Sequence, residues 1–363
     1  MFKNDYSVDS NKSKFFTTNL FFGKGMKLKM KKLIIYIIIL LTIMFLIPVI
    51  FIRKYENKQI ISQIENTIQQ EQNIKNQYDY KKYTTIKLLH EKTGEVEEIK
   101  LDDYIVNVVC AEMPANFELE ALKAQAVVAR TYTIYKLVGG DRKHENADIC
   151  DNSACCQAWI SKEDRFARWD ENERINNWNK IVNAVDSTNG KIITYDGQPI
   201  NAFFHSNSGG TTEMPINVWG GSGYPYLQVV QTAGEEEYSQ YNSEVILTKE
   251  EFIKKIKEKH SDAIINFEED DCIKILETTE ANRVKTLKIG NIEIAGVEAR
   301  SILGLRSTNF TFEISNTDVK FSVIGYGHGV GMSQTGADAL AKQGQNFEEI
   351  IKHFYVGVEI INM

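Results

Sequence analysis

Residues 104–132, YIVNVVCAEMPANFELEALKAQAVVARTY, contain an apolar run, a short polar link and a long helical pattern in succession. The apolar run at 104–109 predicts a strand. A helix is predicted over 117–140, because acidic residues occupy its first turn, an apolar stripe runs along it and two glycines end it. Glu112 falls in the link, where apolar walls would raise the pKa of a carboxyl group. A capping or solvent-exposed glutamate is the alternative interpretation.

Hairpins and further helices flank this stretch. Helical patterns cover residues 164–188 and 248–260, and alternating apolar residues about a turn predict three hairpins. Their turns are Thr93-Gly94, Asp196-Gly197 and Gly290-Asn291. Because no regular strand–helix–strand repeat joins these elements, the predicted class is α+β. This region holds about 280 residues, more than one core normally spans, so we expect two lobes.

A separate apolar segment, LIIYIIILLTIMFLIPVIFI, occupies residues 33–52. An uncharged helix of this length can cross a hydrocarbon core of about 30 Å. A cleaved signal peptide is the alternative, but its apolar region is shorter and ends in small residues, whereas Arg53 and Lys54 follow here. The predicted order is a basic cytoplasmic tail at 1–32, a single transmembrane helix at 33–52, a stalk at 53–82 and an extracytoplasmic region at 83–363.

The charge is distributed unevenly about this segment. Residues 1–32 carry a net charge of +6, from eight lysines and two aspartates, so the remainder carries −13 of the total of −7. The positive-inside rule therefore places the N-terminus in the cytoplasm. The acidic exterior part disfavours nucleic acid and anionic lipid surfaces as partners, because both need a basic field, but it does not exclude a neutral carbohydrate.

The stretch FFHSNSGGTTE, residues 203–213, is a candidate ligand-binding loop. His205, Ser206 and Ser208 lie between a predicted strand and a pair of glycines. A loop in this position can present both side chains and backbone groups to a ligand, although a turn with hydrogen-bonded polar residues would have the same composition.

A second candidate loop, IGYGHGVGMSQTGADALAKQG, covers residues 324–344. Its glycines permit close backbone approach around His328 and Gln334, and the helix that follows supplies free N–H groups. A serine hydrolase with Ser206 or Ser208 as nucleophile and His328 as base is one interpretation. No G-x-S-x-G elbow surrounds either serine, so the signal for that class is weak.

Three of the five cysteines lie in HENADICDNSACC, residues 144–156. On the extracytoplasmic side a Cys150–Cys156 disulfide is possible, whereas neighbouring cysteines pair poorly. Zinc accounts for more of the residues, because four side chains of the types that bind structural zinc are present. They are His144, Cys150, Cys155 and Cys156. A fully liganded zinc has no position for water, so we expect it to brace a loop. The remaining cysteines, Cys110 and Cys272, are expected to be free and buried.

Three blocks of the sequence resemble the signature blocks of the stage II sporulation protein D (SpoIID) family, which includes the amidase enhancer LytB. The blocks are CAEMPANFELEALKAQAVVARTY at 110–132, FFHSNSGG…VWG…YPYLQVV within 203–230 and GYGHGVGMSQTGADALAKQGQNFEEIIKHFYVGVEI at 325–360. The resemblance implies an extracytoplasmic lytic transglycosylase of peptidoglycan in which Glu112 is both catalytic acid and base. It also implies a role in forespore engulfment at the septal or engulfing membrane, on peptide-stripped glycan strands, beside a SpoIIP-type amidase/endopeptidase. The amidase-enhancer branch leaves a non-catalytic wall-binding module as the alternative.

In this mechanism one carboxyl group serves both steps, whereas ordinary glycoside hydrolases use a second carboxylate about 5–9.5 Å away. The acids that could be that second group are Asp102, Asp103, Glu118 and Glu213. A further set of residues is assigned to substrate binding or to orienting Glu112. It consists of Lys123, His205, Ser206, Ser208, His328 and Gln334.

The cysteine cluster departs from the pattern of the family at one position. Family members that carry the cluster often have His-Cys-Gln where this chain has Cys155-Cys156-Gln157. The exchange replaces one type of zinc ligand by another, which suits a retained metal site and leaves the fourth ligand open.

Overall fold

The computed structural model describes residues 31–44, 46, 53–54, 58–62, 64, 80–139 and 144–363. The chain divides into two compact units, residues 1–77 and 78–363. In the first unit residues 31–44 are helical, and none of the helices described reaches the length and apolarity that crossing a bilayer requires. Most of the predicted cytoplasmic tail, and parts of the predicted membrane span and stalk, lie outside the described residues. The membrane anchor stays a prediction.

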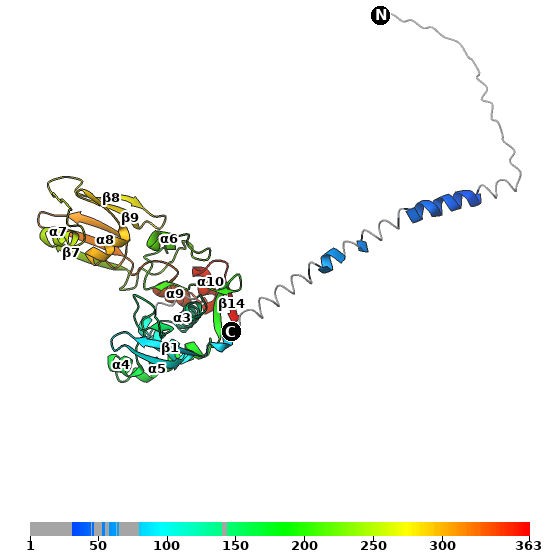
Figure 1. Ribbon diagram of the computed structural model, residues 1–363, viewed down its shortest axis with the longest axis horizontal. Helices are drawn as coiled ribbons and strands as arrows, with labels where there is room; N and C mark the ends of the chain where they lie inside the picture. The colour runs from blue at the N-terminus through cyan, green and yellow to red at the C-terminus, as the bar shows by residue number, and fades with distance from the viewer. Residues whose placement is uncertain are drawn as a thin grey trace, which may run out of the picture. The chain divides into compact units, whose positions relative to one another are not determined.

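The second unit combines helices with small sheets, which confirms the predicted α+β class (Figure 1). Its helices are η1 Tyr80–Lys82, α2 Leu101–Glu112, α3 Leu119–Gly139, α4 Lys162–Arg168, α5 Arg174–Asp186, α6 Pro215–Trp219, α7 Lys249–Lys257, α8 Gly296–Leu303, α9 Gln334–Lys342 and α10 Phe347–Phe354. Its strands are β1 Thr85–His90, β2 Glu95–Lys100, β3 Ile149–Cys150, β4 Lys191–Tyr195, β5 Gln198–Pro199, β6 Phe204–His205, β7 Asn242–Thr248, β8 Ile273–Thr278, β9 Val284–Ile289, β10 Ile292–Ala295, β11 Phe310–Ile314, β12 Asp318–Ile324, β13 Met332–Ser333 and β14 Glu359–Asn362.

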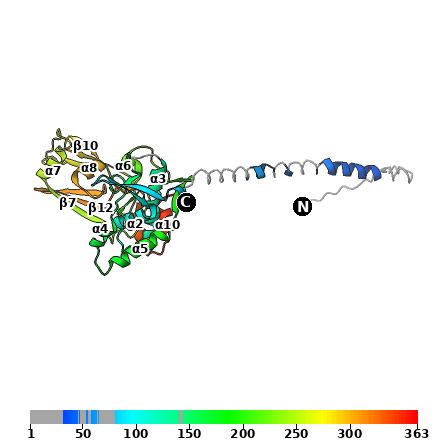
Figure 2. The same cartoon turned by 60° about the horizontal axis from the view of Figure 1, so that its bottom comes forward.

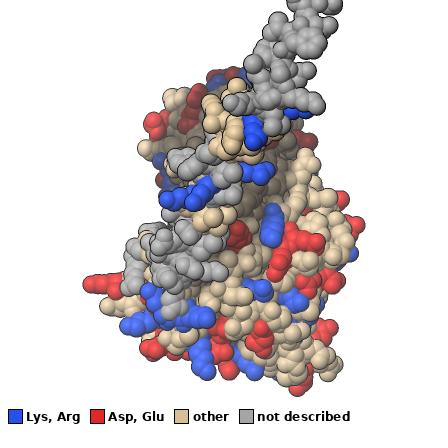
Figure 3. Space-filling model, turned by 90° about the vertical axis from the view of Figure 1, so that its right-hand side faces the viewer, with Lys and Arg blue, Asp and Glu red and all other residues tan. Residues whose placement is uncertain are grey.

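The described residues of this unit form two hydrophobic clusters. In the first, helix α3 packs against α2, α5, α9, α10 and the sheet β14-β4-β5. In the second, α7 and α8 cover the sheets β10-β9-β8 and β11-β12-β7. Figures 1 and 2 both show these two groups of elements side by side. On the face drawn in Figure 3, acidic and basic side chains are interspersed.

The strand predicted for residues 104–109 is wrong, because these residues belong to helix α2. Nearly every side chain of this run is buried, including Tyr104, Ile105, Val108 and Val109. A helix buried on all faces shows no amphipathic period and cannot be told from a buried strand by its pattern. As a result Glu112 is the last residue of a helix and precedes the link to α3.

The other predicted elements agree more closely with the structure. All three hairpins form at the predicted turns, as β1-β2, β4-β5 and β9-β10, and the helix predicted at 248–260 corresponds to α7. The helical pattern at 164–188 is divided into α4 and α5, because Trp169 takes an extended conformation and Asp170 begins a turn, as aspartate commonly does.

Helix α3 is fixed to its neighbours by Arg130, whose side chain is fully buried. Its Nε and Nη2 donate to Oδ1 of Asp102 on α2, at 3.1 and 2.9 Å. Nη1 donates to the carbonyl oxygens of Thr188 at 2.9 Å and of Lys191 at 3.3 Å. One guanidinium group thus connects two helices, the loop after α5 and strand β4.

We predict that Arg130→Met lowers the free energy of unfolding by about 3 kcal/mol, because it leaves a carboxylate and buried carbonyl groups without their donor. The measurement is chemical denaturation of the purified protein. Arg168→Met is the control: Arg168 is exposed at the end of α4, and surface substitutions change stability by only about 0.5 kcal/mol. Equal losses in the two variants would contradict the prediction.

Candidate active site

Glu112 is held at the end of α2 by two hydrogen bonds. Its Oε1 accepts from the backbone N–H of Ala158 at 2.8 Å, and its Oε2 accepts from Nε2 of Gln334 at 3.4 Å. Burial raises the pKa of this carboxyl group above its usual range, and the two hydrogen bonds oppose the shift. A carboxyl group in this state is suited to donate a proton near neutral pH.

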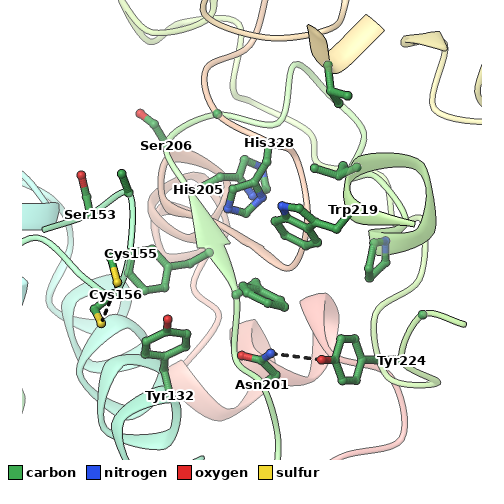
Figure 4. A pocket seen from close by; sticks show the side chains of 18 of the residues that line it. Tyr132, Ser153, Cys155, Cys156, Asn201, His205, Ser206, Trp219, Tyr224 and His328 are labelled. Carbon is green, nitrogen blue, oxygen red and sulfur yellow. Dashed lines mark hydrogen bonds between the residues drawn. The ribbon is translucent and has the colours of Figure 1, made fainter. Parts of the chain in front are cut away.

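Glu112 lies on the wall of a cavity of about 1140 Å³, called the main cleft here. The predicted residues His205, Ser206, His328 and Gln334 also line it, so the structure brings five of the predicted site residues together with Cys155 and Cys156. Figure 4 shows the labelled side chains around this space. Arg300 of α8 is a lining residue as well, so both hydrophobic clusters contribute to the cleft.

Aromatic rings form one side of the main cleft. The ring of Phe203 lies 4.6 Å from that of Trp219 and 6.3 Å from that of Tyr224, measured between centroids, and Trp219 is 5.1 Å from the ring of His328. Trp219 is about half exposed, at 51%. Rings that keep an accessible face offer apolar surface to the C–H faces of a sugar.

A second cavity of about 250 Å³, called the side cavity here, lies against the same carboxyl group. Glu112, Ser206 and Gln334 line both cavities. The acid therefore stands at the junction of two spaces, and an extended ligand could occupy both sides of it.

The two polar loops predicted from the sequence meet at strands β6 and β13, which pair in parallel with Ser333 opposite His205. The buried carboxylate of Glu235 joins them. It accepts from the backbone N–H groups of Ser208 and Gly210, both at 3.1 Å, and from a set of hydroxyl groups. The hydroxyl donors are Ser208, Thr232, Ser333 and Thr335.

Both histidines of the cleft are neutral. Nδ1 of His205 lies 3.1 Å from the carbonyl oxygen of Val330, so it carries the proton, and its buried Nε2 is an acceptor with no partner among the described residues. Burial and the nearby Arg283 lower the pKa of His205 to about 3. Burial also lowers the pKa of His328 well below its usual range, and its Nδ1 accepts from the N–H of Val330 at 3.0 Å.

The geometry does not assemble a serine hydrolase. The hydroxyl of Ser208 donates to Glu235 and is buried away from the cleft. Ser206 lines the cleft, but in the described part of the chain no hydrogen bond joins it to His328.

The other acids considered lie elsewhere. Asp102 pairs with Arg130, and Asp103 and Glu118 are exposed. Glu213 is buried, with its oxygens accepting from the N–H of Met214, the amide of Asn217 and the hydroxyl of Thr279. Among the described residues that line the main cleft and the side cavity, Glu112 is the only carboxylic acid.

Lys123 and Ser208 are the predicted substrate residues that the structure does not bring to the cavity walls. Nζ of Lys123 forms an ion pair of 2.7 Å with Glu120 on the same helix. Their contact with a substrate stays a prediction.

The His/Cys cluster has the geometry of a metal site. The ligand atoms of His144, Cys150, Cys155 and Cys156 all lie within 4.8 Å of one another. The two sulfurs of Cys155 and Cys156 are 3.8 Å apart, and Nε2 of His144 is 3.5 and 3.7 Å from them. Sulfurs bound at about 2.3 Å to a tetrahedral zinc are about 3.8 Å apart, so the donor set fits such an ion.

All five cysteines are free thiols, so the alternative Cys150–Cys156 disulfide is absent from this structure. Cys110 and Cys272 are free and buried, as predicted. The cluster borders the main cleft through Cys155 and Cys156. Two residues beyond Cys156, Ala158 donates to Glu112. A metal ion held by the cluster would therefore brace the segment that positions the acid.

Several residues of the site were missed from the sequence. Trp219 and Tyr224 occur next to glycines after a predicted loop, a pattern that could have marked them as ligand-binding aromatics. Glu235 begins the run Glu235-Glu236-Glu237 and has the pattern of a solvent-exposed charge. Arg300 comes from the second hydrophobic cluster, and no local pattern connects it to the cleft.

Fold and site together define an α+β protein in which a single, partly buried carboxylic acid stands among the described residues that line a cleft beside a His/Cys cluster. Residues 89–195, which include Glu112 and the cluster, match the SpoIID family, described as stage II sporulation protein. The chain is 35% identical to stage II sporulation protein D of Bacillus amyloliquefaciens and to that of Bacillus subtilis strain 168, in each case over 73% of this chain and 75% of the relative. It is 30% identical to the amidase enhancer of B. subtilis, over 70% of this chain and 39% of that protein. The chain therefore belongs to the SpoIID family.

The raised pKa of Glu112 predicts a pH-dependent effect of Glu112→Gln on stability. The fold favours the protonated carboxyl group, so its contribution is fully present below the unfolded pKa and is lost as pH rises through the folded pKa. The melting temperature of Glu112→Gln relative to wild type should therefore rise between about pH 4 and pH 8. Glu118→Gln, at an exposed position, is the control. A relative melting temperature that falls over this range would show that the fold favours the carboxylate.

Proposed function

We propose that this protein is a peptidoglycan lytic transglycosylase that cleaves the bond between N-acetylmuramic acid and N-acetylglucosamine and leaves 1,6-anhydro-muramic acid ends. The observation that carries the proposal is the position of Glu112, a partly buried carboxylic acid between two cavities with no other acid among the described lining residues.

In the first step Glu112 donates its proton to the glycosidic oxygen as an oxocarbenium-like centre forms at C1 of the muramic acid. Burial, which raises the pKa of Glu112, keeps the proton available for this step. The hydrogen bonds from Ala158 and Gln334 then stabilise the carboxylate that remains.

In the second step the Glu112 carboxylate accepts the proton of the C6 hydroxyl, whose oxygen bonds to C1 and closes the anhydro ring. The nucleophile belongs to the substrate. Retaining and inverting hydrolases instead place a second carboxylate about 5–9.5 Å from the first. The lack of another acid among the described residues of the cleft supports the single-carboxyl route.

The relatives support the biological setting. Two of them are stage II sporulation protein D of Bacillus species, and we place this protein in forespore engulfment during sporulation. The proposal includes a transmembrane anchor at residues 33–52, an extracytoplasmic catalytic region at 83–363, peptide-stripped strands as substrate and a SpoIIP-type amidase/endopeptidase as partner. A non-catalytic wall-binding enhancer is the second candidate, favoured by the likeness to the amidase enhancer.

Substitution of Glu112 separates these two candidates. Glu112→Gln keeps the size of the side chain but cannot transfer the proton, so strand cleavage should fall by at least about 10²–10⁴-fold while strand binding persists. The measurement is the rate of release of soluble fragments from purified glycan strands, with Glu118→Gln as the matched control. Cleavage by Glu112→Gln at the wild-type rate would remove Glu112 from the chemistry.

We further propose that the His/Cys cluster holds one structural zinc ion. The support is the match between its sulfur and nitrogen separations and tetrahedral zinc geometry. The ion would take no part in the reaction. It would fix residues 155–158, and with them the N–H that binds Glu112.

The zinc proposal predicts about one zinc per chain in protein purified without chelators. Cys155→Ser should lose the metal and lower the melting temperature, whereas Cys272→Ser, outside the cluster, should retain the metal. Elemental analysis of the two variants and the wild type makes the comparison. Wild-type protein that is folded and free of zinc would refute it.

A further inference from the structure

The side cavity contains a cation that the proposed chemistry does not use. Arg165 of α4 lines this cavity together with Glu112. Among the described residues its buried Nε has no hydrogen-bond partner, and none of their carboxylates lies within ion-pair distance of its guanidinium. The planar group lies over the ring of Trp169, 4.7 Å from its centroid.

The surroundings of Arg165 do not neutralise it. Burial raises the pKa of the neighbouring Cys110 to about 12, so this thiol is uncharged. The other polar side chains that line the cavity are uncharged as well, apart from Glu112, which burial keeps toward its protonated form. The side cavity thus holds one cation without an ion-pair partner among the described residues, in a part of the chain with a net charge of −13.

An arginine with unused N–H donors binds carboxylates well, because its planar fork matches two carboxylate oxygens. We propose that Arg165 binds a carboxylate of the glycan strand in the side cavity and so determines which strands are accepted. This inference rests on one part of the proposed function, the binding of a glycan strand past Glu112, and does not require that the strand is cleaved.

The muramic acid of peptidoglycan carries a lactyl group that ends in a carboxyl. In a peptide-stripped strand this group is a free carboxylate, whereas in a peptide-bearing strand it is an uncharged amide. Stem peptides have carboxylates of their own, which are a second source of the same chemistry. A cavity of about 250 Å³ is below the range of about 300–1,000 Å³ that takes drug-sized molecules, so it suits a lactyl group better than a peptide.

The test compares the binding of three labelled strands to the full-length protein at one ionic strength. The first is peptide-stripped, the second is the same strand with its lactyl carboxylates converted to methylamides, and the third bears stem peptides. Wild type should bind the first about tenfold or more tightly than the second, as expected for a charge-assisted pair. Arg165→Gln should abolish this ratio, and Arg165→Lys should retain part of it.

Arg168→Gln is the matched control, because Arg168 lies one turn further along α4 and does not line the side cavity. It should keep the wild-type ratio. A ratio that Arg165→Lys retains in part shows that the loss in Arg165→Gln comes from the missing charge and not from misfolding. Thermal unfolding of each variant checks its folding directly.

Two results would overturn the inference. One is an unchanged ratio in Arg165→Gln. The other is a loss of affinity in Arg165→Gln that is confined to the peptide-bearing strand, which would assign the carboxylate to the stem peptide. Binding does not need cleavage. A wild-type protein that binds the peptide-stripped strand more tightly than the methylamide strand but cleaves neither would therefore contradict the transglycosylase proposal and support this inference.

Discussion

The hydrogen bond from the N–H of Ala158 to Glu112 sets the position of the acid on which the account depends. At 2.8 Å it is the shorter of the two bonds to this carboxyl group. Two neighbours fix the segment that supplies this N–H. Cys155 and Cys156 belong to the His/Cys cluster, and the buried amide of Gln157 donates to the hydroxyl groups of Tyr104 and Thr133. A carboxyl group that is desolvated and also fixed by donors can exist in both protonation states, which an acid–base catalyst requires.

The opposite wall depends on a different carboxylate. Glu235 has no catalytic position, but it accepts hydrogen bonds from both polar loops and holds them beside the cleft. Close backbone approach is needed there as well. Gly331 has a positive φ of 73°, and a Cβ at this position would lie 2.0 Å from the carbonyl oxygen of Phe203. Glycine at this position therefore permits the close packing of the two loops.

The sequence predicted the parts of this structure that local chemistry determines. Hairpin turns and the long helix depend on neighbouring residues, and the structure agrees with both. The four side chains of the His/Cys cluster come together as well, and their binding of a metal stays a prediction. The strand predicted at 104–109 was wrong because full burial removes the amphipathic signal. Arg165 and Glu235 could not be found, since their environments arise from elements far apart in the chain. The sequence alone could not show that Lys123 forms an ion pair with Glu120 on the same helix.

The central claim is that the carboxyl group of Glu112 directs the substrate's own hydroxyl, and not water, onto the anomeric carbon. Mass spectrometry of fragments formed from peptide-stripped strands in heavy-oxygen water tests this most directly. The account predicts ends that are one water lighter than reducing ends and carry no heavy oxygen. Reducing ends that contain heavy oxygen, or strands left whole by the wild-type protein, would contradict it.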